Sequence, residues 1–155
     1  MPSTPESRIQ ELRLTLPKPP KPVAKYRPAL LVGNLLHVSG HGPVQPDGTL
    51  LTGRVGAELD TAQGKDAARV VGLAILSTVR NTLGSLDRVR RLVKTLGMVN
   101  CTPAYTDHPQ VINGFSEVMA EVFGEEAGVG ARSAVGMVSL PGNIAVEIEC
   151  IFEVG

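Results

Sequence analysis

The spacing of apolar residues along the chain predicts two long amphipathic helices. In the segment 61–83, aliphatic residues recur every three or four positions, Asp60 or the next residue can cap the start, and Gly84 follows as a C-terminal stop. A second apolar stripe runs over 111–122 and stops at Gly124. Because both stripes are broad and aliphatic, both helices are expected to pack against a common core.

Runs of β-favouring residues predict strands in the rest of the chain. They are 29–32, 35–39, 89–99, 131–139 and a stretch that begins at 144, with a short additional strand at 50–51. The first two flank Gly33-Asn34, a two-residue connection typical of a β-hairpin. The last two flank Leu140-Pro141-Gly142-Asn143, where proline at the second and glycine at the third position predict a type II turn. We therefore expect a C-terminal hairpin around this turn.

The predicted order is strand, strand, helix, strand, helix, strand, strand, which indicates an α+β fold with a mixed β-sheet and both helices on one face. The segments 29–32 and 35–39 carry apolar residues on both faces, and two helices cover only one. A closed homo-oligomer is therefore expected to cover the other face, with clefts at its subunit boundaries. A short helix and a proline-rich linker are expected in residues 1–25, followed by a single domain over 26–155.

The composition excludes several classes of function. With 155 residues, 15 Lys plus Arg against 15 Asp plus Glu, no Trp and 3% aromatic residues, the chain lacks the basic stripe and stacking platforms of a nucleic-acid binder. No segment approaches the roughly 20 apolar residues of a membrane span, and no apolar secretory signal is present, so a cytoplasmic location is expected. Cys101 and Cys150 are far apart and are expected to be reduced.

The candidate chemistry centres on the predicted C-terminal hairpin. Arg132 begins one strand, and Glu147 and Glu149 share one face of the other. A guanidinium near a carboxylate suggests a small carboxylate ligand and acid/base chemistry on it. The alternative is that Arg132 pairs with one of these glutamates across the strands. Alternation alone does not separate Glu147 from Glu149.

Other polar residues carry weaker signals. Ser39 is expected on the same strand face as His37 and His41, which would be consistent with a serine nucleophile or with a two-histidine metal site. Neither is favoured, because the chain has no GxSxG elbow and no third ligand, so no metal is expected. Asn113 is either a helix-surface residue or a hydrogen-bonding group directed to a cleft, and the pattern leaves Tyr26 undetermined.

These residues together resemble the reactive intermediate deaminase family, also called the YjgF-type or L-PSP endoribonuclease family. The resemblance runs from about residue 26 to the end, and it is carried by the following segments: Tyr26, Val32–Gly40, Asn113, Ala131–Val135, Leu140-Pro141 and Val146–Glu149. It implies a chorismate-mutase-like α+β fold, a homotrimer, ligand sites at the subunit boundaries and no cofactor.

The resemblance also implies roles for individual residues. Arg132 would bind the substrate carboxylate with help from the backbone of Gly40, and Glu147 rather than Glu149 would be the acid that handles water. The remaining pocket residues would be Tyr26, Ser39 and Asn113. The implied reaction is hydrolysis of reactive 2-enamino or 2-imino acids to 2-oxo acids and ammonia, with Arg132 fixing the carboxylate beside a water that Glu147 orients.

Two departures place the chain in a divergent branch of that family. Ala134 stands where many members have cysteine, and His41 stands where glutamine is frequent. Two alternative functions stay open at this point. One is a non-catalytic trimer that binds small carboxylate metabolites, and the other is an endoribonuclease, against which the neutral charge and few aromatic residues count.

Overall fold

The computed structural model describes residues 2–155 and shows one mixed five-stranded sheet in the order β1-β2-β5-β3-β4. The strands are β1 (Ala29–Val32), β2 (Leu35–His41), β3 (Val89–Asn100), β4 (Ala131–Met137) and β5 (Val146–Val154). All neighbours are antiparallel except β3 and β4, which are parallel and joined through a helix. The predicted α+β class and the β1–β2 hairpin are therefore confirmed. The segment 50–51 forms only an isolated bridge rather than a strand.

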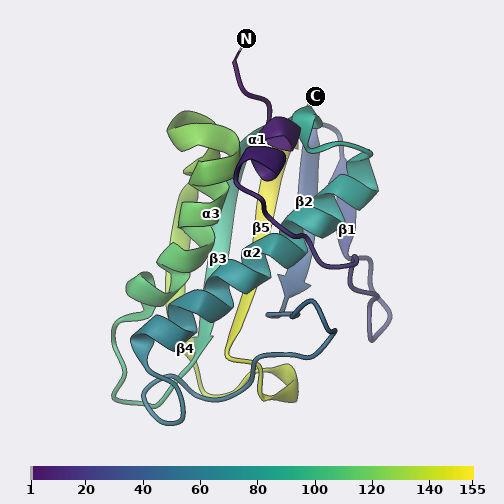
Figure 1. The fold of residues 1–155 in the computed structure, drawn as a ribbon. Helices are drawn as coiled ribbons and strands as arrows, with labels where there is room; N and C mark the ends of the chain where they lie inside the picture. Colours follow the sequence, from purple (N-terminus) through teal and green to yellow (C-terminus); the bar gives the residue numbers. More distant parts are fainter. Residues whose placement is uncertain (1) are drawn as a thin grey trace.

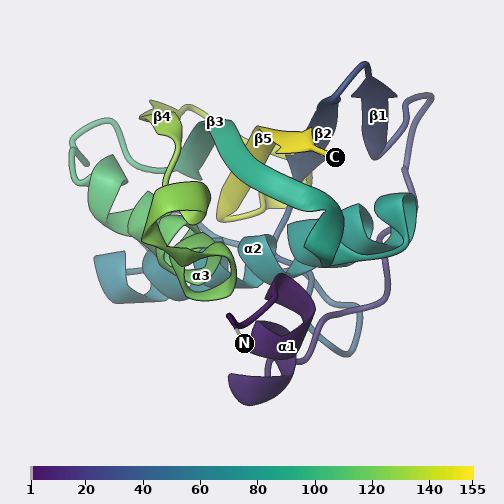
Figure 2. The ribbon, with the colours of Figure 1, turned by 90° about the horizontal axis from the view of Figure 1, so that it is seen from above.

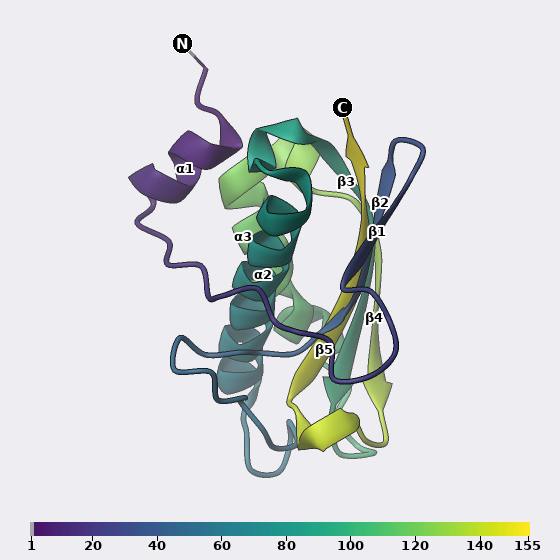
Figure 3. The same ribbon diagram turned by 90° about the vertical axis from the view of Figure 1, so that its right-hand side faces the viewer.

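Both long helices lie on one face of the sheet, as expected (Figure 1). They are α2 (Thr61–Leu83) and α3 (His108–Gly128). Asp60 caps α2 through a capping box, and Gly84 ends the helix in the left-handed conformation with φ 85°. In α3 the helical geometry breaks at Gly124, where φ is also 85°. Figure 3 shows the helix layer and the sheet edge-on, with no helix on the opposite face of the sheet in the described residues.

The predicted C-terminal hairpin is wrong, although its turn is present. The Asn143 amide donates to the Leu140 carbonyl at 3.0 Å, and Gly142 has φ 62°, as a type II turn requires. However, β4 and β5 do not pair with each other, because β3 lies between them and pairs with both. The turn, with the short 3-10 helix η2 (Pro141–Asn143), therefore carries the chain past one strand of the sheet.

Alternation along β5 separates a buried face from an open one. Ile148 and Phe152 are fully buried beneath the helices, whereas Glu147 and Glu149 lie on the face without helices. That open face exposes apolar side chains: Leu30 is 49% exposed, and Val135 is 37% exposed. The expectation of apolar residues on both faces is confirmed, and the open face keeps apolar surface in contact with water.

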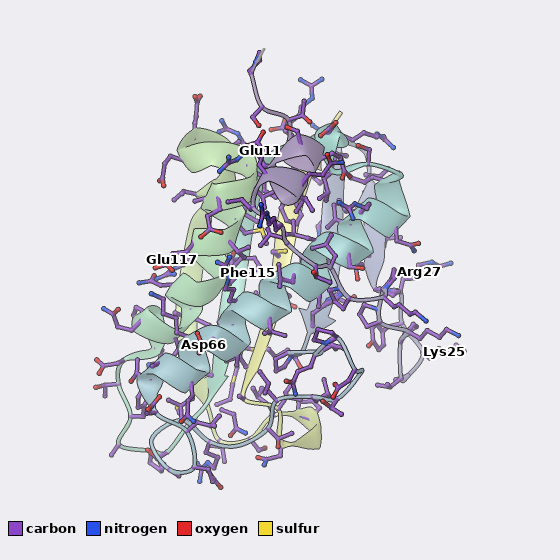
Figure 4. The ribbon with its side chains drawn as sticks, viewed as in Figure 1. Glu11, Lys25, Arg27, Asp66, Phe115 and Glu117 are labelled. Carbon is purple, nitrogen blue, oxygen red and sulfur yellow. The ribbon has the colours of Figure 1, made fainter. Side chains whose placement is uncertain are left out.

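The two long helices pack closely in their N-terminal halves. At Gly114 of α3, an added Cβ would lie 2.0 Å from the Lys65 carbonyl oxygen of α2. Phe115, labelled in Figure 4, is fully buried next to this crossing. Backbone therefore meets backbone where the two helices cross, which fixes the position of α3 above the sheet.

The N-terminal helix α1 (Pro5–Glu11) lies on the side of the helix layer away from the sheet (Figure 2). Its Glu6 accepts two hydrogen bonds from Arg80 of α2, at 2.6 and 3.1 Å. The same carboxylate accepts a bond from the Leu86 amide at 2.9 Å, where the 3-10 helix η1 (Leu86–Arg88) begins. Ile9 is buried in the main core. Polar and apolar contacts thus attach α1 to the helices.

Candidate functional site

Arg132 lies on the helix-facing side of β4. Its register partner on β3 is Thr95, which is buried, and its guanidinium reaches α3. There Nη1 donates to Ser116 Oγ at 3.0 Å and Nη2 donates to the Pro109 carbonyl at 3.3 Å. Within residues 2–155, no carboxylate lies within 4.0 Å of this guanidinium. Arg132 therefore has anchors but no counter-ion, and the alternative of pairing with Glu147 or Glu149 does not hold in the single chain.

Asn113 belongs to the same side of α3 as these anchors. Pro109, Asn113 and Ser116 follow one another at i, i+4 and i+7, so they form one stripe on the helix surface. Asn113 is half-buried. Of the two interpretations of this asparagine, the placement beside the Arg132 anchors favours a polar group at the edge of a site.

Glu147 and Glu149 lie together on the open face, as alternation predicted. Their partners on β3 are Met98 and Leu96, respectively. Partial burial raises the pKa of Glu147, and the negative charge of Glu149 raises this pKa further. A Cβ on Gly40 would come within 2.5 Å of Glu147 Oε2, so the glycine leaves room for this carboxylate.

Arg132 and Glu147 consequently point away from each other within one chain. Arg132 shares the helix side of the sheet with Thr95, whereas Glu147 shares the open side with Met98. The intervening strand β3 separates them laterally as well. A single subunit does not bring together the guanidinium and the carboxylate that the sequence singled out.

Tyr26 and Ser39 line a cavity of about 590 Å³ on the open face. Ser39 Oγ donates to the Arg27 carbonyl at 2.6 Å, which ties β2 to the segment before β1. Figure 4 shows Arg27 and Lys25 on that segment, on the opposite side of the molecule from α3. Glu149 also lines the cavity, so the tyrosine and the serine share it with a carboxylate.

Two cations in this cavity escaped the sequence analysis. Arg27 and Lys94 both line it, together with His37. Lys94 belongs to a basic run that resembles an ordinary half-exposed strand. Lys94 stands two residues before Leu96, the partner of Glu149, so the alternation of side chains along β3 could have placed Lys94 on the same face as Glu149.

His41 does not share a face with His37 and Ser39, so that prediction is wrong. Between Val38 and His41 the pairing with β5 contains a β-bulge, and the extra residue reverses the side on which the next side chain lies. His41 is buried against α2, where its Nε2 lies 2.8 Å from Thr78 Oγ1. Burial lowers the pKa of His41, and the bond to the Ser39 carbonyl opposes this.

Residues 2–155 contain no group of three or more metal-ligating side chains. The same part of the chain has no helix whose length and apolar character would let it cross a membrane.

Comparison with known families gives a match over almost the whole chain. Residues 6–151 match the family described as "YjgF/chorismate mutase-like, putative endoribonuclease". Protein TCP17 of Trypanosoma cruzi is 40% identical over 147 residues, which are 95% of this chain and 92% of that protein. Protein HMF1 of Saccharomyces cerevisiae is 31% identical, covering 85% of this chain and 86% of its own length.

Solved structures show the same fold. The crystal structure of Atu1372 from Agrobacterium tumefaciens has a TM-score of 0.87 and 41% identity, covering 97% of this chain and 92% of that one. A Shewanella oneidensis structure described as a "putative endoribonuclease" has a TM-score of 0.92 and 28% identity, covering 97% and 99%. Both similarities include α1 and the linker, because they extend over nearly all of this chain.

Proposed function

The chain belongs to the YjgF/chorismate-mutase-like family, and we propose that it hydrolyses reactive 2-enamino or 2-imino acids to 2-oxo acids and ammonia in clefts between the subunits of a homotrimer. The substrate would be a small carboxylate, and the acting residues would be Arg132 and Glu147. Tyr26, Ser39, Gly40 and Asn113 would complete the pocket.

The observation that carries the proposal is the state of Arg132. Its guanidinium is held by Ser116 and the Pro109 carbonyl, and no carboxylate in residues 2–155 neutralises it. A guanidinium fixed in this way keeps donors free for a carboxylate and loses little entropy when one binds. A small anionic substrate fits this arrangement.

Two features of the geometry support the participation of a second copy. Arg132 and Glu147 lie on opposite sides of the sheet, and the open face exposes apolar side chains such as Leu30 and Val135. A neighbouring subunit that covers the open face would bury this apolar surface. It would also allow the carboxylate of one copy to approach the guanidinium of another.

The chemistry is addition of water to an imine. Arg132 would hold the substrate carboxylate, so that the adjacent C=N carbon faces a water near Glu147. The water oxygen bonds to that carbon, its proton passes to the nitrogen through the carboxyl group, and ammonia leaves as the C=O bond forms. Because its pKa is raised, Glu147 is better matched to donating and accepting a proton than an ordinary glutamate.

The test is 2-oxo acid release from an imino acid generated in the assay by a pyridoxal-phosphate-dependent serine or threonine dehydratase. The protein should speed release of pyruvate or 2-oxobutyrate beyond spontaneous hydrolysis. Arg132→Ala and Glu147→Gln should each abolish the acceleration. Glu153→Gln, on the same strand and face but at its far end, is the matched control and should keep it. An unaffected Arg132→Ala variant would refute the assignment.

Two alternatives give different results in the same set of experiments. A non-catalytic binder would bind 2-oxobutyrate in an Arg132-dependent manner by calorimetry, without accelerating product release. An endoribonuclease, the activity named in the family description and for the Shewanella protein, would bind RNA with a steep salt dependence and cleave it. Light scattering of the purified protein tests the homotrimer directly.

A further inference from the structure

A second pocket, of about 300 Å³, lies on the helix side of the sheet where β3 ends, and the proposed deamination does not use it. Cys101, the residue directly after β3, lines it together with His108, the first residue of α3. Cys101 Sγ is 3.4 Å from His108 Nε2. A thiol and an imidazole within hydrogen-bonding distance, both facing a cavity, have the arrangement of a nucleophile beside its base.

The structure holds this pair in place from two sides. The Tyr105 ring meets the His108 ring edge-on, with centroids 5.6 Å apart, and the Tyr105 hydroxyl lies 2.8 Å from Thr61 Oγ1 at the start of α2. On the other side, a Cβ at Gly136 would be 2.5 Å from His108 Nε2 and 2.8 Å from Cys101 Sγ. Only glycine at this position of β4 leaves room for the thiol and the imidazole to meet.

The pocket also contains a cation. Arg54 lines it, and its Nη2 donates to the Cys101 carbonyl at 2.7 Å. Its Nε is buried without a hydrogen-bond partner in the part of the chain that the structure describes. Within residues 2–155 no carboxylate lies within 4.0 Å of this guanidinium. The buried Nε is out of reach of the pocket, but the bond from Nη2 is the only hydrogen bond of this guanidinium within residues 2–155, so the Nη donors that remain could bind a small anion.

We propose that Cys101 and His108 form a thiol–imidazole pair that reacts covalently with small anionic electrophiles held in this pocket by Arg54. His108 Nε2 takes the thiol proton, in the tautomer that carries its own proton on Nδ1. The sulfur then bonds to the electrophilic carbon. With an α,β-unsaturated carboxylate, the π electrons move to the α-carbon, which receives the proton back from His108, so the product is a thioether and nothing leaves.

Cys150 provides an internal control. It is also a free thiol, but it lies in β5 within the main core. Burial raises the pKa of Cys150, with a further contribution from the charge of Glu149, and no base in the described residues is hydrogen-bonded to it. Cys101 is itself 6% exposed, and Cys150 borders the 590 Å³ cavity, so the difference between the two thiols lies in the imidazole hydrogen-bonded to Cys101 rather than in exposure or in bordering a cavity.

The experiment compares alkylation by iodoacetate, which is anionic, with alkylation by iodoacetamide, which is neutral. Peptide mass spectrometry of the native protein at pH 7 gives a rate for each cysteine. In both reactions the S–C bond forms as iodide leaves. We expect Cys101 to react at least about tenfold faster than Cys150, with a preference for iodoacetate. Equal rates for the two cysteines, or a folded protein with unreactive Cys101, would overturn the proposal.

Three variants separate the parts of the pair. His108→Ala should slow Cys101 alkylation at least about tenfold, because the general base is lost. Gly136→Ala should slow it comparably while leaving both reactive residues present. Arg54→Gln should reduce the preference for iodoacetate and leave the iodoacetamide rate nearly unchanged. His108→Asn replaces His108→Ala if the latter melts early, and unchanged rates in folded variants would refute the corresponding role.

Discussion

Gly114→Ala tests whether the α2–α3 crossing is set by backbone contact. The new Cβ would lie 2.0 Å from the Lys65 carbonyl oxygen and 3.1 Å from the Arg69 amide nitrogen. Neither is the end of a flexible side chain, so the helices must separate by about 1 Å. Overpacking against rigid backbone should cost about 3 kcal/mol, and the better helix propensity of alanine should return about 1 kcal/mol. The expected net destabilisation is about 2 kcal/mol.

Thermal and urea unfolding measure this change, and a fall in Tm of about 4–8 °C is expected for a domain of this size. Gly64→Ala is the matched control, since its Cβ would meet only the side chains of Val55 and Val111, at 3.0 and 3.1 Å. It should be close to neutral. If Gly114→Ala instead stabilises the protein by up to about 1 kcal/mol, helix propensity dominates and the close-contact reasoning is refuted.

Three further predictions concern charge and pH. Glu6→Gln should destabilise the protein by about 1 kcal/mol at pH 7, because the partly exposed pair with Arg80 is lost. Burial tends to raise the pKa of Glu6, but its hydrogen bonds and the charge of Arg80 lower this pKa overall. The stabilisation by the Glu6 carboxylate should therefore decrease as pH falls below 4.5. Urea unfolding of the wild type and of Glu6→Gln at several pH values would show this. Glu147→Gln should raise Tm at pH 7, because ionising the partly buried carboxylate opposes folding, and the gain should vanish once the acid is protonated in the unfolded chain, below pH 4.5. The pKa of the buried His41 is lowered, so below pH 6.5 the unfolded chain binds a proton that the folded protein does not, and the free energy of unfolding falls. His41→Gln should remove part of this loss. An unchanged slope of the free energy of unfolding against pH would contradict the prediction.

Local signals predicted the elements well. The helix that begins after Asp60 and ends before Gly84 has its cap, its apolar period and its stop within a single stretch of sequence, and all three are present. The Gly33-Asn34 connection likewise specifies a hairpin without help from the rest of the chain.

Long-range pairing was not predictable in the same way. The residues of the turn at Leu140–Asn143 predict that the chain changes direction there. No residue near the turn indicates that β3 lies between β4 and β5, the two strands that the turn connects. The bulge before His41 was also not predictable, because the extra residue does not change the pattern of apolar and polar residues along β2. Cys101 and His108 meet across a loop, so their separation in the sequence carries no periodic signal.

The central position of β5 has a consequence for how the protein is made. β5 (Val146–Val154) follows the other four strands in the sequence, yet it lies between β2 and β3 in the sheet and is hydrogen-bonded to both. During synthesis, the N-terminal hairpin and the β3–α3–β4 unit emerge first and have no strand to join them. The sheet can close only after β5 has left the ribosome, so the two parts that it joins stay without their shared partner until that strand has been made. A premature stop between β4 and β5 would release a hairpin and a β3–α3–β4 unit that no strand joins, both with unpaired edges, which is the kind of product that aggregates or is degraded.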